Sequence, residues 1–123
     1  MARKVLIIDD EEDMLTYLNT LFKKAGYETA TASNGEDALE KIETLQPDFI
    51  TLDILMPKKS GLNFFKAIRA DSRHKNLPVV VLSGISGHQE FFDQSDDSGP
   101  SIFIEKPIEP KAFMKKVADF IGE

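Results

Sequence analysis

No cysteine occurs among the 123 residues, which excludes a disulfide framework, a thiolate metal site and a cysteine nucleophile. Long hydrophobic runs are missing as well. Only residues 5–8 form an apolar run before Asp9, which is too short for a signal-peptide core or a transmembrane helix. Positive charge is in deficit, because 21 acidic side chains stand against 15 basic ones and the formal charge is -6. We therefore expect a cytoplasmic protein that binds neither membranes nor, directly, nucleic acid.

Short β-rich runs alternate along the chain with segments of helical periodicity. Strands are predicted at residues 5–8, 28–32, 47–53, 78–83 and 102–105. After the first of them, Leu15, Leu18 and Phe22 recur at the three- and four-residue spacing of one helix face. One face of a second helix is predicted from Ala38, Leu39, Ile42 and Leu45. The alternation predicts an α/β fold with a five-stranded parallel sheet and helices on both faces. The length fits a single domain over residues 1–123.

Residues 86–100 fit this alternation poorly. They contain only two large apolar residues, Phe91 and Phe92, and a Ser- and Asp-rich stretch leads into Gly99 and Pro100. A fourth helix in this region is therefore expected to be short, shifted or mobile.

Polar side chains follow four of the predicted strands at the point where each strand ends. They are Asp9 and Asp10, Asp53, Ser83 and Lys106. In a parallel sheet, ligands bind outside the carboxyl ends of the strands. We therefore expect three carboxylates, a hydroxyl and a lysine to share one pocket.

Acidic residues fill positions 9–13 without interruption. One or two of them are explained as caps of a helix N-terminus. Five exceed that need, because adjacent like charges repel unless a cation or protons compensate. Oxygen-only ligands suit a hard ion such as Mg²⁺, so a metal site is the alternative interpretation.

Asp53 also has two interpretations. It could cap the turn that follows its strand, or it could act as a nucleophile, because carboxylates form acyl phosphates. Mg²⁺ would then neutralise the phosphoryl donor. Taken singly, Ser83 is a strand-end hydroxyl and Lys106 a solvated charge, but together they suit the oxygens of a transferred phosphoryl group.

In combination these motifs resemble the receiver domain of two-component response regulators, over essentially the whole chain. The matching residues are the Asp9-Asp10 pair, residues 53–57 with Gly61 downstream, Ser83-Gly84 and Lys106-Pro107. The resemblance implies a doubly wound, flavodoxin-like sheet of order 2-1-3-4-5.

The resemblance also implies roles for the site residues. Asp53 would accept a phosphoryl group from a phosphohistidine on a sensor histidine kinase or a histidine phosphotransfer protein. Mg²⁺ would be held by Asp10, Asp53 and the backbone carbonyl of Leu55, with Asp9 acting largely through water. The phosphoryl oxygens would be bound by Ser83 and Lys106, with help from the Gly84 amide, and the Lys106-Pro107 peptide would be cis.

The family further implies a switch and a tuned lifetime of the phosphorylated state. Phosphorylation would draw Ser83 inward and let Phe103 follow, which reshapes the face of helix four, strand five and helix five for a downstream protein target. Periodicity alone would make Phe103 a core residue. Leu55 and Ile85 occupy positions where the family controls access of the attacking water, and their apolar side chains predict slow self-dephosphorylation.

Two other functions compete with phosphorylation-dependent signalling or phosphorelay. A receiver-like scaffold would bind partners regardless of phosphorylation. Its usual signature is loss of an acidic, acceptor or lysine position, and none of these is lost here. A haloacid-dehalogenase-like phosphatase requires a second Asp two residues after the nucleophile, where Leu55 stands. The histidines, His74 and His88, lack companions at ligand spacing and are expected to be exposed and without chemistry.

Overall fold

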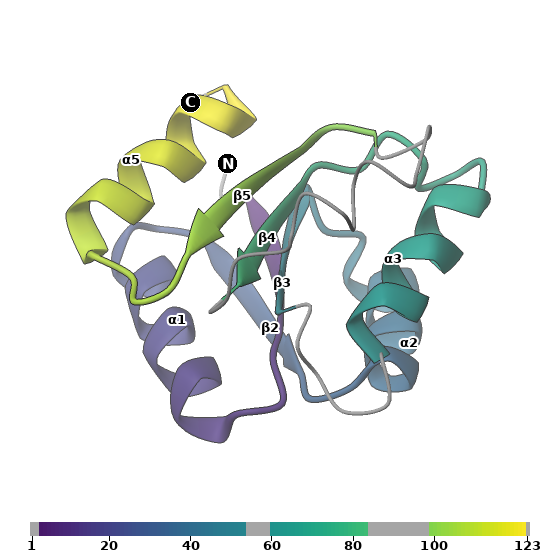
Figure 1. Cartoon of the computed structure of the whole chain (residues 1–123), viewed down its shortest axis with the longest axis horizontal. Helices are drawn as coiled ribbons and strands as arrows, with labels where there is room; N and C mark the ends of the chain where they lie inside the picture. Colours follow the sequence, from purple (N-terminus) through teal and green to yellow (C-terminus); the bar gives the residue numbers. More distant parts are fainter. Residues whose placement is uncertain (1–2, 54–59, 84–98, 123) are drawn as a thin grey trace.

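The computed structural model describes residues 3–53, 60–83 and 99–122. The described strands form one five-stranded sheet in which every pairing is parallel and the order is β2-β1-β3-β4-β5 (Figure 1). Their bounds are β1 Lys4–Ile8, β2 Glu28–Ala32, β3 Phe49–Asp53, β4 Val79–Ser83 and β5 Ser101–Glu105. This confirms the predicted fold class and strand order. The segment in which a weak fourth helix was expected lies almost entirely outside the described residues.

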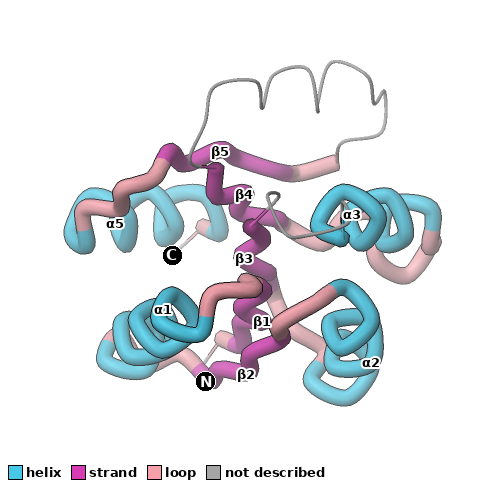
Figure 2. The backbone as a smooth tube through the Cα atoms, turned by 60° about the horizontal axis from the view of Figure 1, so that its bottom comes forward, coloured by secondary structure: helices cyan, strands magenta, loops and turns pink. Residues whose placement is uncertain are grey.

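Helices cover both faces of this sheet. Two of them, α1 Glu12–Lys24 and α5 Pro110–Ile121, pack on one face, and α2 Gly35–Leu45 and α3 Ser60–Ala70 pack on the other (Figure 2). In the part of the chain that the structure describes, no helix combines the length and the apolar character needed to span a bilayer.

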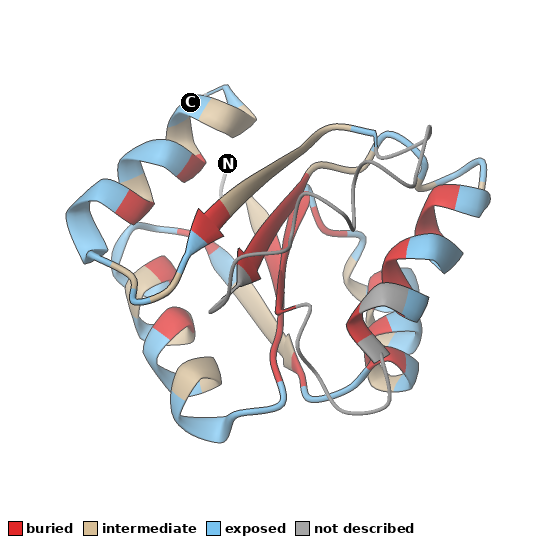
Figure 3. Ribbon diagram, in the orientation of Figure 1, coloured by how far each residue is buried: buried red, intermediate tan, exposed pale blue. Residues whose placement is uncertain are grey.

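The core lies on both sides of the sheet because the strands are apolar on both faces. In β1, Leu6 and Ile8 belong to the cluster under α2 and α3, while Val5 and Ile7 belong to the cluster under α1 and α5. The central strands are buried along their length, and exposure rises on the outer helix surfaces (Figure 3). Two covered faces fix the sheet and hence the positions of its strand ends.

Local signals in the sequence explain where the helices begin. The side chain of Asn34 caps α2 by accepting a hydrogen bond of 2.8 Å from the Asp37 amide. Glu109 caps α5 by accepting from the Ala112 amide at 2.7 Å, and Pro110 occupies the first turn, where a missing N–H costs nothing. In α1, acidic residues in the first turn and lysines in the last complement the helix dipole.

One position on a predicted helix face differs from the expectation. Leu39 shares the apolar pattern of the second helix, but it is 40% exposed. Ala38 and Ile42 point at the sheet and are fully buried, and Leu39 lies about 100° around the helix from Ala38. Leu39 therefore lies beside the buried face of α2 and not on it.

Candidate functional site

The carboxyl edge of the sheet brings the predicted acidic residues together. Asp9 and Asp10 follow β1 directly, and Asp53 is the last residue of the neighbouring strand β3. The register pairs Ile8 with Leu52, so Asp9 and Asp53 leave adjacent strands at the same level. The Asp9 amide also donates to the Ala32 carbonyl at 3.1 Å, which extends the pairing with β2 by one residue and holds Asp9 in place.

Lys106 completes this cluster from the other side. It follows β5, and its Nζ lies 3.3 Å from Asp53 Oδ2 and 3.5 Å from Asp9 Oδ2. The Asp9 and Asp53 side chains are almost fully buried, and that of Lys106 is 17% exposed. One cation thus faces two buried carboxylates, which leaves the site with an excess of negative charge.

This charge excess appears in the proton affinity of Asp9. Burial and the nearby Asp53 carboxylate raise the pKa of Asp9 to about 6, although the Glu11 amide donates to its Oδ1 at 2.9 Å and opposes the shift. Its Oδ2 is buried and accepts no hydrogen bond from the described residues, although Lys106 lies nearby. For Lys106, burial works against the charged form, but the attraction of Asp53 and Asp9 outweighs it and the pKa of the lysine is raised.

The donor set fits a hard divalent cation. Carboxylate oxygens of Asp9, Asp10, Glu11 and Asp53 all lie within 4.8 Å of one another. Two of these residues are buried and two are exposed, so the cluster opens to solvent on one side. The unsatisfied Oδ2 of Asp9 and the all-oxygen ligands match the preference of Mg²⁺ for a few carboxylates and several waters.

Glu11 is a member of this cluster that sequence reasoning did not single out. Its carboxylate contributes to the group of four, and its amide orients Asp9. The only signal was its place in the acidic run at positions 9–13, which does not tell a ligand from a helix-capping residue.

Of the remaining predicted site residues, some lie among the described residues and others do not. Ser83 ends β4 and pairs with Glu105 in register, so its backbone is at the same edge as Asp53. The peptide bond between Lys106 and Pro107 is cis, the isomer that the resemblance implies. Leu55, Gly84 and Ile85 lie outside the described residues.

Phe103 differs from a fully buried core residue. It is half-buried on β5 and packs at the margin of the core under α2 and α3. It also lines a hollow of about 410 Å³ with Ile102 of β5 and Phe120 of α5. β5 is an edge strand of the described sheet, so its residues contact neighbours on fewer sides than those of β3 or β4.

Comparisons with known proteins agree with this geometry. The family model of the response regulator receiver domain matches residues 5–118. The chain is 38% identical to chemotaxis protein CheY of Thermotoga maritima, over 89% of this chain and 90% of that protein. It is 30% identical to the polar-differentiation response regulator DivK of Brucella anthropi, over 100% of this chain and 99% of that protein.

A longer relative and a solved structure extend the comparison. The chain is 34% identical to the alkaline phosphatase synthesis transcriptional regulatory protein PhoP of Bacillus subtilis, over 95% of this chain but only 48% of that protein. The chemotaxis response regulator CheY4 of Vibrio cholerae superposes with a TM-score of 0.86 at 28% identity, over 98% of this chain and 99% of that chain. From the sheet order, the acidic cluster and these matches, we conclude that the chain belongs to the response regulator receiver domains of two-component signalling.

Proposed function

We propose that the chain accepts a phosphoryl group on Asp53 from a phosphohistidine of a sensor histidine kinase or a histidine phosphotransfer protein. The observation that carries this proposal is the pairing of two buried carboxylates with one lysine beside further acidic oxygens. Lys106 Nζ lies 3.3 Å from Asp53 Oδ2 and 3.5 Å from Asp9 Oδ2, and Asp10 and Glu11 belong to the same carboxylate cluster. A carboxylate held beside a cation, with further acidic oxygens that suit Mg²⁺, has the parts that phosphoryl transfer requires.

In the transfer step, an Asp53 carboxylate oxygen attacks phosphorus and the phosphorus–nitrogen bond of the phosphohistidine breaks. The imidazole leaves with the bonding electron pair and is protonated by solvent. Mg²⁺ supplies charge neutralisation when it is bound. Asp9, Asp10, Asp53 and the Leu55 carbonyl are proposed to hold it, with Asp9 acting largely through water. Burial of Asp53 excludes competing water from the acceptor, since its side chain is 4% exposed.

Lys106 has two parts in this scheme. Before transfer it offsets the repulsion between Asp9 and Asp53, and after transfer its ammonium group donates to an oxygen of the phosphoryl group. Ser83, at the end of β4, is proposed to bind a second phosphoryl oxygen with the Gly84 amide. The raised pKa of Lys106 supports a charged ammonium throughout the physiological pH range.

The signal is proposed to leave the domain through β5 and α5. Phe103 is half-buried beside a hollow that it shares with α5, so a change of its rotamer alters the surface offered to a downstream target. The apolar Leu55 and Ile85 are proposed to slow the self-dephosphorylation that returns the domain to its resting state. Self-phosphorylation from a phosphodonor and this slow self-dephosphorylation are the only reactions proposed for the chain. It is otherwise proposed to act as a signalling protein in the cytoplasm.

The test is the intact mass of the chain after incubation with acetyl phosphate and Mg²⁺. We expect one added phosphate in the wild type, and none in Asp53→Asn or in the presence of a chelator. Asp13→Asn is the matched control, because Asp13 belongs to the same acidic run but is exposed and stands outside the cluster of four. Labelling that persists in Asp53→Asn would refute the acceptor assignment. No labelling of the wild type would favour the phosphorylation-independent scaffold.

A further inference from the structure

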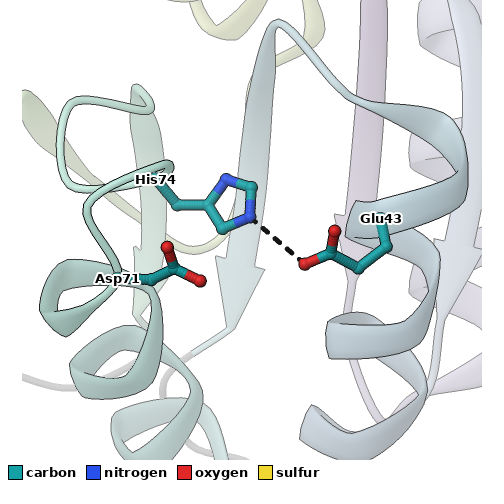
Figure 4. Close-up of side chains that lie close together, drawn as sticks. All are labelled: Glu43, Asp71 and His74. Carbon is teal, nitrogen blue, oxygen red and sulfur yellow. Dashed lines mark ion pairs between the residues drawn. The ribbon is translucent and has the colours of Figure 1, made fainter.

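A second cluster of potential metal ligands lies at the opposite edge of the sheet. Glu43 is on α2, and Asp71 and His74 are in the turn that follows α3. One ligand atom from each of the three lies within 4.8 Å of the others. Figure 4 shows the three side chains directed into the space between α2 and that turn. The expectation of an exposed His74 is wrong, because its side chain is only 17% exposed.

The ring of His74 is oriented toward this cluster, with a buried nitrogen that lies near Glu43 but makes no hydrogen bond with the described residues. Its Nε2 lies 3.5 Å from Glu43 Oε1, and this nitrogen is buried without a hydrogen bond to any described residue. The backbone around it is fixed, because the His74 amide donates to the Asp71 carbonyl at 2.9 Å. Arg69 also donates to the His74 carbonyl at 3.1 Å. The backbone therefore fixes the position of the imidazole, and its Nε2 makes no hydrogen bond with the described residues.

Arg73 is the present counter-ion of the two carboxylates. Its guanidinium donates to both oxygens of Glu43, at 2.8 and 2.9 Å, and to both oxygens of Asp71, at 2.7 and 3.1 Å. The Arg73 side chain is 62% exposed, so it can swing into solvent when a competing cation reaches the carboxylates.

Access to the cluster is open. A hollow of about 310 Å³ is lined by Glu43, Arg73 and His74 together with Ile42, Pro47 and Leu77. Pro47 precedes β3 and Leu77 precedes β4, so the hollow is at the amino edge of the sheet, away from Asp53. An ion can therefore enter without disturbing the phosphorylation site.

We propose that Glu43, Asp71 and His74 form a second cation site, selective for borderline divalent ions such as Zn²⁺, in which the metal displaces Arg73. Imidazole and carboxylate together suit Zn²⁺, whose sites commonly use three protein ligands and a water. Mg²⁺ prefers oxygen ligands only, so we expect Mg²⁺ to bind the acidic cluster and Zn²⁺ to bind the cluster that contains His74. Binding would join α2 to the turn after α3, since the ligands come from both.

The test is a calorimetric titration of the intact chain with Zn²⁺ in the presence of excess Mg²⁺, which occupies the acidic cluster. His74→Ala is expected to weaken binding at least about tenfold, on the scale of losses at metal sites. His88→Ala is the matched control and should bind like the wild type. Arg73→Met removes the competing cation and should bind Zn²⁺ more tightly than the wild type. Far-UV circular dichroism of each variant checks that the chain is folded.

A second readout separates ligation from a structural effect. The ring resonances of His74 should shift on addition of Zn²⁺ while those of His88 stay in place, because these are the two histidines of the chain. Absence of zinc binding by the wild type would overturn the proposal, even if Arg73→Met binds. Equal binding by His74→Ala, or equal losses in the two histidine variants, would overturn it as well. Phosphorylation of Asp53 is measured independently, so either proposal can fail alone.

Discussion

Carboxylates meet a cationic side chain at both edges of this sheet, but the two clusters are built differently. At the carboxyl edge, Asp9 and Asp53 are buried and share one lysine, whose Nζ is 3.3 and 3.5 Å away. At the amino edge, Glu43 and Asp71 are partly exposed and share an arginine that donates to all four of their oxygens.

The two environments shift the pKa values of their carboxylates in opposite directions. Burial and like charge raise the pKa of Asp9 to about 6, whereas the hydrogen bonds of Arg73 lower the pKa of Asp71 to about 2. The five N–H donors of a guanidinium let Arg73 bond all four oxygens of its two carboxylates, whereas the ammonium of Lys106 leaves Asp9 Oδ2 without a hydrogen bond from the described residues. The buried cluster therefore retains an excess of negative charge that a bound cation can offset. A cation at the exposed cluster must first displace the Arg73 side chain.

Removal of the lysine should produce the largest effect. In Lys106→Met the two buried carboxylates lose their shared cation, and we expect phosphorylation from acetyl phosphate to slow about 100-fold or more. The measurement is the time course of the intact mass in excess Mg²⁺. Lys115→Met, on the exposed surface of α5, serves as the control. A rate equal to that of the wild type would show that Lys106 does not take part in transfer.

Neutralising Asp9 should stabilise the metal-free domain in a pH-dependent way. The folded-state pKa is raised from 3.8 to about 6, so ionisation of Asp9 costs native stability as the pH rises through this interval. Asp9→Asn is expected to raise the free energy of unfolding at pH 7.5 by up to about 3 kcal/mol, and by nothing below about pH 4. Urea denaturation with a chelator present measures this. A gain that is independent of pH would contradict the electrostatic explanation.

The buried arginine behind the exposed cluster should matter more than the arginine within it. Arg69 is 9% exposed, and it donates to the Leu77 carbonyl at 2.7 Å and the Pro100 carbonyl at 3.0 Å. Pro100 keeps a bond from the Val79 amide, but Leu77 loses its side-chain donor in Arg69→Met. We expect a loss of about 2 kcal/mol in unfolding free energy. A chemical-denaturation midpoint equal to that of the wild type would exclude this role.

The smallest effect is expected for Arg73→Met in the absence of zinc. Its ion pairs are exposed and screened by salt, so the melting temperature should fall by no more than a few degrees at low salt. The difference from the wild type should disappear at high salt. A large loss that persists at high salt would mean that the exposed cluster stabilises the fold in the same way as a buried one.

Much of the cluster at the carboxyl edge could be predicted because its residues follow strands that are recognisable one at a time. Asp9, Asp53 and Lys106 each come at or after the end of an apolar run, and parallel strands bring such ends to one edge. Glu11 was missed because an acidic residue before a helix is common without a metal. Leu39 was misplaced because helical periodicity locates a face only to within one position.

The cluster of Glu43, Asp71 and His74 could not be predicted in this way. Its members come from a helix and a turn about 30 residues apart in sequence, with no ligand-like spacing between the two segments. They meet because α2 and α3 pack on the same face of the sheet.

From the amino-acid sequence alone we could infer the alternation of strands and helices, the parallel order through the family resemblance, and the edge at which the acidic residues gather. The folded structure was needed to show that Asp9 is buried beside Asp53 with one lysine between them, and that Arg73 joins two carboxylates at the other edge. The physical reason is one of range. Periodicity and capping depend on neighbours along the chain, whereas burial and charge pairing depend on distances that packing sets.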